Sequence, residues 1–329
     1  MADKVKSKGR HANSGDLIID WAGLPVFSLV GGATGFRAQF LRSLETEFTK
    51  RGLDLAVLPG EIFHNPYTLS LSARHHDLVV VDGPSHLPLQ RIYLGESGAE
   101  AAGDLFLHGP EVEAVEIFMP RLVARLDELV NRTPVWACIL IGGKSSRMGR
   151  PKHLIAGEDG RTWLERTIEL LQPSVAGIVV SGKGQIPEPV ADTIRLADIP
   201  GVVGPLAGIL SACRWQPQVS WLIVACDMPN ITAAAVQWLL AGRRAGCWGR
   251  VPRLAGSDHC EPLFAWYDCR AAQLFEEQFC AGQLRIGEVA GHPRIDSPLV
   301  PEPLRHAFLN VNTPAELAAA KPYSKELSR

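Results

Sequence analysis

Several kinds of segment are missing from this 329-residue chain, and each absence narrows what the protein can be. No run approaches 18 consecutive apolar residues, so the sequence predicts no helix that spans a membrane. Residues 1–14 are charged and small and lack the apolar stretch of a signal peptide. We therefore expect a disordered leader and a cytoplasmic protein.

An excess of one charge and paired cysteines are missing as well. With 33 Lys and Arg against 35 Asp and Glu, the net charge is −2, which predicts no general attraction to nucleic acid. The seven cysteines are an odd number without a CxxC pair, and several lie in apolar runs. This pattern favours buried or partly buried thiols over disulfides or a zinc site.

What the chain does contain is an alternation of strand and helix patterns. Its length is twice the roughly 150 residues of one domain, so we expect two domains. In the first, an apolar run leads into a glycine loop and a helix, and two further apolar runs lack alternation, as in strands buried on both faces. The predicted elements are strands at 24–30, 54–58 and 77–81, helices at 37–50 and about 112–130, and a linker at 131–134.

The second half begins at once with the same layout. Its predicted strands are 135–141, 178–181, 193–196 and 221–225, and its predicted helices are about 162–171, 205–214 and 233–240. Such alternation predicts an α/β fold with two domains, each a mostly parallel sheet flanked by helices, and ligands at the carboxyl ends of the strands. We assign 1–14 to the leader, 15–131 to the first domain, 134–321 to the second and 322–329 to a tail.

The segment 142–152, GGKSSRMGRPK, packs three glycines and four cations into the turn after a predicted buried strand. Glycines let the backbone approach a phosphate closely, and Lys and Arg neutralise a triphosphate. The loop is not a Walker A motif, because no GK[ST] ends it. A solvated basic turn is the alternative, which this particular spacing disfavours.

Together with four later motifs, this loop resembles the molybdenum cofactor guanylyltransferases, relatives of enzymes that transfer nucleotides to sugar phosphates. The resemblance extends over about 135–321, with all five motifs in register, and implies a Rossmann-like nucleotidyltransferase domain. It further implies GTP and the molybdopterin cofactor as substrates and Mg²⁺ as the metal. The later motifs are GPLAGI at 204–209, ACDMP at 225–229, EPLFA at 261–265 and FLNVNTP at 308–314.

The resemblance and the local chemistry together imply the catalytic residues Arg147, Lys152 and Asp227. Asp227 follows a predicted apolar strand, where a carboxylate can hold Mg²⁺ against the triphosphate, so it is the predicted metal ligand. The alternative role for Asp227 is a helix N-cap before Pro229. Arg147 and Lys152 would stabilise the in-line transition state, with no covalent enzyme intermediate.

Further residues are expected to contact the ligands. Asp198 is expected near the nucleotide and metal, and its alternative role is that of a turn residue before Pro200. Gly204 and Gly208 are expected near the site, and their alternative role is to allow close helix–sheet packing. Asn310 and Asn312 match the family segment that faces ligand and metal, although Asn312 alternatively caps the helix that starts near residue 314. The predicted nucleotide-binding residues are Leu140, Gly142, Gly143, Lys152, Asp198, Gly204 and Asp227.

GTP is favoured over CTP because the guanylyl branch of the family has Gly-Gly where the cytidylyl branch usually has Ala-Gly, and this chain has Gly142-Gly143. Ile141 departs from the family's usual alanine and is expected to tighten the floor of the base pocket. Two other interpretations stay open: cytidylyl or sugar-phosphate transfer, and a non-catalytic carrier or chaperone. Expected partners are GTP, the molybdopterin cofactor, and molybdoenzyme apoproteins or delivery chaperones, with neither nucleic acid nor membrane.

The first domain is similar, over two motifs, to the MobB-like adaptor GTPase of the same pathway. The motifs are the glycine loop at 31–35 and HDLVVVDGPSHLPL at 76–89. Phe36 and Arg37 stand where the phosphate loop would need Lys and Thr, so we predict a degenerate domain without GTP hydrolysis, kept for docking, dimerisation or presentation of a partner. An unrelated α/β domain is the alternative. Three histidines lie in this region, at His75, His76 and His86. Their strand context favours a surface pair and a loop residue over a metal site.

Overall fold

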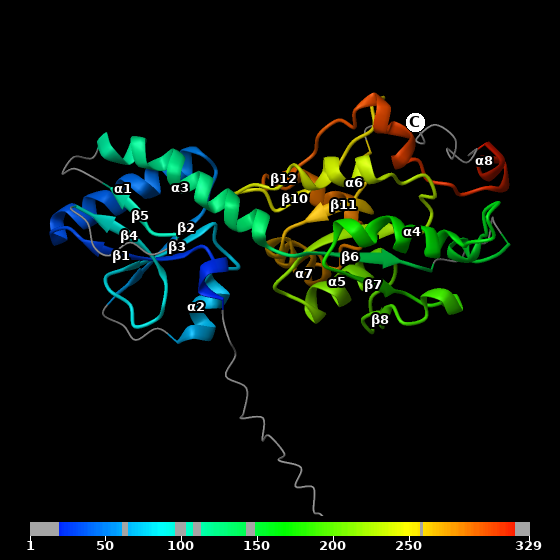
Figure 1. Ribbon diagram of the computed structural model, residues 1–329, viewed down its shortest axis with the longest axis horizontal. Coiled ribbons are helices and arrows are strands. Elements are labelled where there is room, and N and C mark those ends of the chain that lie inside the picture. The colour runs from blue at the N-terminus through cyan, green and yellow to red at the C-terminus, as the bar shows by residue number, and fades with distance from the viewer. Residues whose placement is uncertain are drawn as a thin grey trace, which may run out of the picture.

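The structure is a computed structural model that describes residues 20–60, 65–95, 103–107, 113–142, 149–256 and 259–319. Each half of the chain forms its own β-sheet, and the two sheets lie at opposite ends of an elongated molecule (Figure 1). The predicted leader at 1–14 and tail at 322–329 fall outside the described residues. The predicted α/β fold class is confirmed.

The first sheet has the strand order β2-β3-β1-β4-β5, and all of its strands are parallel. Runs of Val, Leu and Ile that are buried on both faces produce its central strands. Strands β4 and β5 were not predicted, because their short sequences lack a recognisable period. The bounds are β1 Val26–Gly31, β2 Leu55–Pro59, β3 Leu78–Asp82, β4 Gln90–Leu94 and β5 Leu105–Leu107.

Helices cover both faces of this first sheet. Helices α1 (Thr34–Lys50) and α3 (Glu113–Arg132) pack on one face, while α2 (Pro66–Ser72) and the short η1 (Trp21–Gly23) pack on the other. Because α3 continues to Arg132, the predicted linker at 131–134 shrinks to residues 133–134.

The second sheet has the order β12-β10-β11-β9-β6-β7-β8. It is mixed, since β11 runs antiparallel to both β9 and β10. The predicted strands β6 to β9 are confirmed, whereas β10 to β12 were missed because two of them have only two residues. The bounds are β6 Val135–Leu140, β7 Gly177–Ser181, β8 Ile194–Leu196, β9 Ser220–Ala225, β10 Gly249–Arg250, β11 Phe264–Tyr267 and β12 Ile295–Asp296.

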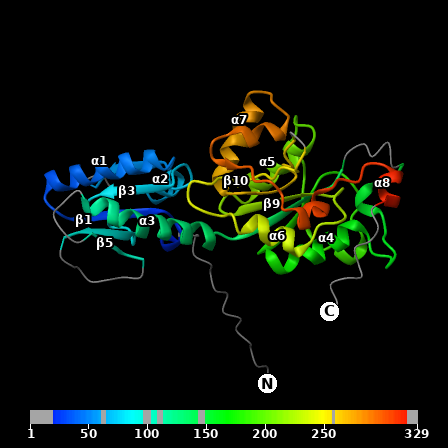
Figure 2. The ribbon, with the colours of Figure 1, turned by 90° about the horizontal axis from the view of Figure 1, so that it is seen from above.

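Two helices cover each face of this second sheet, which makes a three-layer sandwich (Figure 2). Helices α5 (Pro205–Trp215) and α7 (Ala272–Cys280) pack on one face, and α4 (Trp163–Leu171) and α6 (Ala233–Leu240) on the other. Helix α4 begins at a capping box between Thr162 and Glu165, which satisfies N–H groups at the start of the helix. A last short helix, α8 (Pro314–Ala319), lies near the far end of the molecule.

The direction of strand order changes at β6. The chain moves from β6 to β7 and β8 on one side, and then crosses to β9 on the other. In sheets of this kind the crevice at the carboxyl ends of the two strands beside such a switch point is the usual ligand site. In the described residues, no helix is both long and apolar enough to cross a membrane.

A buried ionic cluster joins the two halves of the chain. The Asp77 carboxylate, with no exposed side-chain surface, accepts hydrogen bonds from Arg270 and, at 2.6 Å, from Arg294, both in the second half. It also accepts from the backbone N–H groups of Asp54 and Gly246. Burial acts to lower the pKa of Arg270, but the carboxylates of Asp268 and Asp77 outweigh it and raise that pKa. The halves are therefore held together by charge as well as by the chain connection.

Candidate active site

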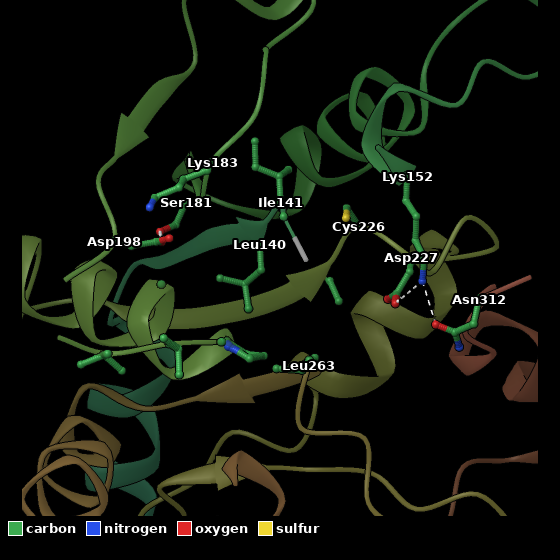
Figure 3. A pocket seen from close by; sticks show the side chains of 17 residues that line it. Leu140, Ile141, Lys152, Ser181, Lys183, Asp198, Cys226, Asp227, Leu263 and Asn312 are labelled. Carbon is green, nitrogen blue, oxygen red and sulfur yellow. Dashed lines mark hydrogen bonds and ion pairs between the residues drawn. The ribbon is translucent and has the colours of Figure 1, made fainter. Parts of the chain in front are cut away.

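A cavity of about 830 Å³ opens at the carboxyl ends of β6, β7 and β9, beside the switch point (Figure 3). This volume is in the range of small-molecule sites. Its walls combine apolar side chains with two lysines and two aspartates. The lining residues are Leu140, Ile141, Gly142, Lys152, Ser181, Lys183, Asp198, Val202, Val203, Gly204, Pro205, Gly208, Ala225, Cys226, Asp227, Leu263 and Asn312.

Lys152 is the centre of a polar cluster at one end of this cavity. Its ammonium donates hydrogen bonds to Asp227 Oδ2 at 3.0 Å and to Asn312 Oδ1 at 2.7 Å (Figure 3). The Lys152 side chain is 12% exposed and that of Asp227 is 26% exposed, so the pair is partly shielded but open to a ligand. Such a pair is electrostatically stronger than an ion pair in bulk water.

The segment that carries the two asparagines is fastened to the strand end that carries Asp227. The Val311 N–H donates to the Asp227 carbonyl at 2.8 Å, and the side chains on either side of Val311 serve different partners. Asn312 accepts from Lys152, whereas Asn310 donates to the Glu261 carboxylate at 3.0 Å. The structure thus brings Asn312 into the cavity and leaves Asn310 out of its lining.

Asp198 lies at the other end of the cavity, two residues after β8. Its carboxylate accepts a 3.3 Å hydrogen bond from the Ser181 hydroxyl at the end of β7. Gly208 on α5 lets this helix pack close to the ends of β6 and β7, because a Cβ there would lie 2.6 Å from Leu140 Cδ2 and 3.0 Å from Ser181 Oγ. The packing role considered for Gly208 is therefore correct, and it also shapes the cavity wall.

Glu261 is a half-buried carboxyl next to this network. Burial raises its pKa to about 7, although hydrogen bonds from Asn310 and the Leu263 backbone act to lower it, and the Asp227 charge raises it further. The EPLFA motif drew attention to this residue, but its sequence alone assigned it no role. Its protonation changes near neutral pH, unlike that of an exposed glutamate.

Two further residues of the site were missed from the sequence. Burial raises the pKa of the Cys226 thiol to about 11, so this cavity residue is uncharged at neutral pH and is a poor nucleophile. Burial lowers the pKa of His153, whose Nε2 lies 2.9 Å from the Gln185 carbonyl. A neutral His153 can donate that hydrogen bond, which ties the residue after Lys152 to the loop after β7.

The structure decides between several of the alternatives. Asp227 is not a helix cap, because α6 is capped by Thr232, whose side chain accepts from Ala235 N–H. Nor is Asn312 the side-chain cap of α8, since the Thr313 hydroxyl accepts from the Glu316 N–H there. Of the predicted nucleotide-binding residues, the cavity brings together Leu140, Gly142, Lys152, Asp198, Gly204 and Asp227. The predicted residues Gly143 and Arg147 lie outside the described residues.

The donor set at Lys152 and Asp227 fits a hard cation held jointly by protein and substrate. Mg²⁺ in nucleotide enzymes typically takes one or two carboxylates, and phosphates and waters complete its octahedron. Asp227 supplies one carboxylate, and Asn312 adds an amide oxygen nearby. Across the ranges described, no group of three or more His, Cys, Asp and Glu side chains is placed to hold a metal ion.

The cysteines are mostly buried or partly buried thiols, as the sequence predicts. All seven cysteines are free, and four of them are buried. His75 lies 3.0 Å from Gln273, and His76 lies 2.7 Å from Asp54, so both are engaged with protein partners.

The glycine loop of the first half leads directly into α1. Gly31 and Gly32 have φ angles of 82° and 69°, a backbone region that favours glycine. Arg37, in the first turns of α1, forms an ion pair with Asp82 at the end of β3, with 3.1 Å between Nε and Oδ1. In phosphate-loop enzymes a hydroxyl and an aspartate at such positions hold Mg²⁺. Here the Arg37 guanidinium is paired with the Asp82 carboxylate at that position instead.

The second half of the chain matches a family of known proteins. The MobA-like NTP transferase domain family matches residues 137–286. The molybdenum cofactor guanylyltransferase of Rhizobium meliloti (strain 1021) is 38% identical over 206 residues, which cover 56% of this chain and 89% of that protein. A molybdenum cofactor biosynthesis bifunctional protein of Synechocystis is 33% identical over 148 residues, 44% of this chain and 42% of that one.

Among solved structures, molybdopterin-guanine dinucleotide biosynthesis protein A from Archaeoglobus fulgidus is 27% identical and covers 56% of this chain and 96% of its own, with a TM-score of 0.47. The guanylyltransferase of Sinorhizobium fredii (strain NBRC 101917 / NGR234) is 35% identical over 210 residues, 92% of its length. With this degree of identity over nearly the whole of two such enzymes, the chain belongs to the molybdenum cofactor guanylyltransferase family of nucleotidyltransferases.

Proposed function

We propose that this enzyme transfers GMP from GTP to the terminal phosphate of the molybdopterin cofactor and releases pyrophosphate. The observation that carries the proposal is the cluster in which Lys152 bridges Asp227 and Asn312 inside a cavity that also contains Asp198. The names of the relatives favour guanylyl transfer over cytidylyl or sugar-phosphate transfer. We place the reaction in the cytoplasm and expect apoenzymes or delivery chaperones as recipients of the product.

In this reaction a phosphate oxygen of the cofactor attacks the α-phosphorus of GTP. The new P–O bond forms as the bond to the β-phosphate oxygen breaks, and the leaving pyrophosphate takes the electron pair. Lys152 neutralises the triphosphate, and Asn312 fixes the position of its ammonium. Asp227 holds Mg²⁺, which when bound offsets charge on the triphosphate. We assign Arg147 the same charge-neutralising role as Lys152.

Pyrophosphate release is the direct test. The purified protein is given molybdopterin cofactor, Mg²⁺ and GTP, CTP or ATP in turn, beside an Asp227→Asn variant. We expect release with GTP, reduced on the order of 10²-fold or more in the variant. Asp192→Asn, which changes an exposed carboxylate in the same half, is the matched control and should retain activity. No release with any triphosphate would instead favour the carrier hypothesis.

We further propose that residues 15–131 form a degenerate MobB-like domain that does not hydrolyse GTP, followed by a nucleotidyltransferase domain at 134–321. The Arg37–Asp82 ion pair supports this, because it occupies a carboxylate that a phosphate-loop enzyme needs for Mg²⁺. In a full-length Lys152→Met/Asp227→Asn variant, release of inorganic phosphate from GTP should stay at the background rate. A Mg²⁺-dependent rate above background would show that the first half is an active GTPase.

A further inference from the structure

Lys183 is the second lysine of the cavity, and neither a motif nor the reaction has given it a role. It lies two residues after β7, on the same wall as Ser181 and Asp198 (Figure 3). Lys152 is held by two partners, whereas in the ranges that the structure describes no ion pair engages the Lys183 ammonium. The position of the Lys152 ammonium is thus fixed by protein partners at the phosphate end, whereas the Lys183 ammonium has no ion-pair partner among the described residues and is available to a ligand.

The backbone that carries Lys183 is nevertheless fixed. Gly182 has φ 120°, and a Cβ there would lie 1.7 Å from the Ile141 carbonyl oxygen, so only glycine lets the ends of β6 and β7 run this close. Arg195 donates to the Gly182 carbonyl at 3.2 Å, and His153 contacts the Gln185 carbonyl on the other side. The loop therefore presents the lysine from a defined position.

The cavity has two chemically different ends. The Lys152 and Asp227 end suits phosphates and a cation, so the base of a bound nucleotide is directed to the other end. There the apolar side chains of Leu140, Val202 and Val203 contribute to the walls. Val203 is 70% exposed, and a flat base laid against it would remove that apolar surface from water.

We propose that Lys183 selects guanine, by donating a hydrogen bond to the O6 atom of the base while the Asp198 carboxylate accepts from its N1–H and amino groups. Guanine presents an acceptor beside two donors, which this lysine and carboxylate complement. Cytosine presents the opposite order, and adenine places an amino group where guanine has O6, so both would oppose like groups. The Ser181 hydroxyl orients Asp198 for this contact. This inference rests on the proposed function.

The test measures how far Lys183→Met weakens equilibrium binding of two nucleotides in Mg²⁺. They are GTP and 2-aminopurine riboside triphosphate, which lacks O6 and the N1–H but keeps the 2-amino group. We expect a loss of about 10- to 100-fold for GTP, as for a charged hydrogen bond, and little loss for the analogue. Lys50→Met, in the exposed surface of α1, is the matched control and should change neither.

Equal losses for both nucleotides would assign Lys183 to the phosphates and overturn the inference, as would no loss for either. For Asp198→Ala we expect a reduced preference for GTP over ITP, which lacks the amino group, and an unchanged preference would overturn that half of the contact. Failure of the proposed guanylyl reaction gives a different result. The wild-type protein would then release pyrophosphate with CTP instead of GTP, or would release none with any triphosphate.

Discussion

Asp77→Ala should destabilise the protein far more than the loss of a surface carboxylate. The substitution leaves two guanidinium groups without their shared partner, and Arg270 is only 5% exposed while Arg294 is 18% exposed. It also removes the acceptor of two backbone N–H groups. Breaking a buried ion pair from one side typically costs about 3 to 5 kcal/mol. Arg270 keeps its 2.6 Å ion pair with Asp268, but Arg294 and the two N–H groups lose their buried acceptor, so we expect a loss in this range.

Urea denaturation followed by tryptophan fluorescence measures this cost. Of the eight tryptophans only Trp21 precedes β6, so the signal reports mainly on the second half, which contributes Arg270 and Arg294. With a slope near 3 kcal/mol per M, the predicted loss lowers the unfolding midpoint by roughly 1 to 2 M.

Glu276→Ala is the matched control for this measurement. Glu276 also accepts two guanidinium hydrogen bonds, at 2.7 Å each, but both side chains are about two-fifths exposed. Its loss should cost about 1 kcal/mol or less. If Asp77→Ala shifts the midpoint no further than Glu276→Ala, the argument that this interface depends on a buried charge cluster is wrong.

Two further variants test the site. Burial raises the pKa of Glu261 from 4.5 to about 7, so the folded state retains this proton more tightly than the unfolded state, and the free energy of unfolding falls as pH rises from about 4.5 to 7. Glu261→Gln removes this pH-dependent loss. In urea curves at pH 4 and pH 8, its free energy of unfolding should rise relative to that of wild type by on the order of 3 kcal/mol between the two pH values. An equal difference from wild type at both pH values would contradict this. Gly208→Val should push against Leu140 and Ser181 and weaken GTP binding roughly 10-fold or more in a titration, whereas Gly287→Val, at a position with open space, should not. Unchanged affinity in the Gly208 variant would show that the wall yields freely.

The regular elements with a clear hydrophobic pattern were predictable. Buried apolar runs at β1, β3, β6 and β9 and the periodic helices α3 to α6 appear close to their predicted bounds. The strands β4, β5, β10, β11 and β12 were not predicted. All five have two to five residues, and such short segments acquire strand geometry from pairing with neighbours more than from a pattern of their own.

The amino-acid sequence by itself determined the α/β class, the family and most members of the candidate site, because glycine loops and strand-end carboxylates are local signals. Only the tertiary structure decided which side chains meet. Lys152 contacts Asp227 across 75 residues and Asn312 across 160, and Asp77 meets Arg270 across 193. These contacts follow from the order of strands in the sheet and from the packing of the two halves, which depend on long-range pairing that no local pattern encodes.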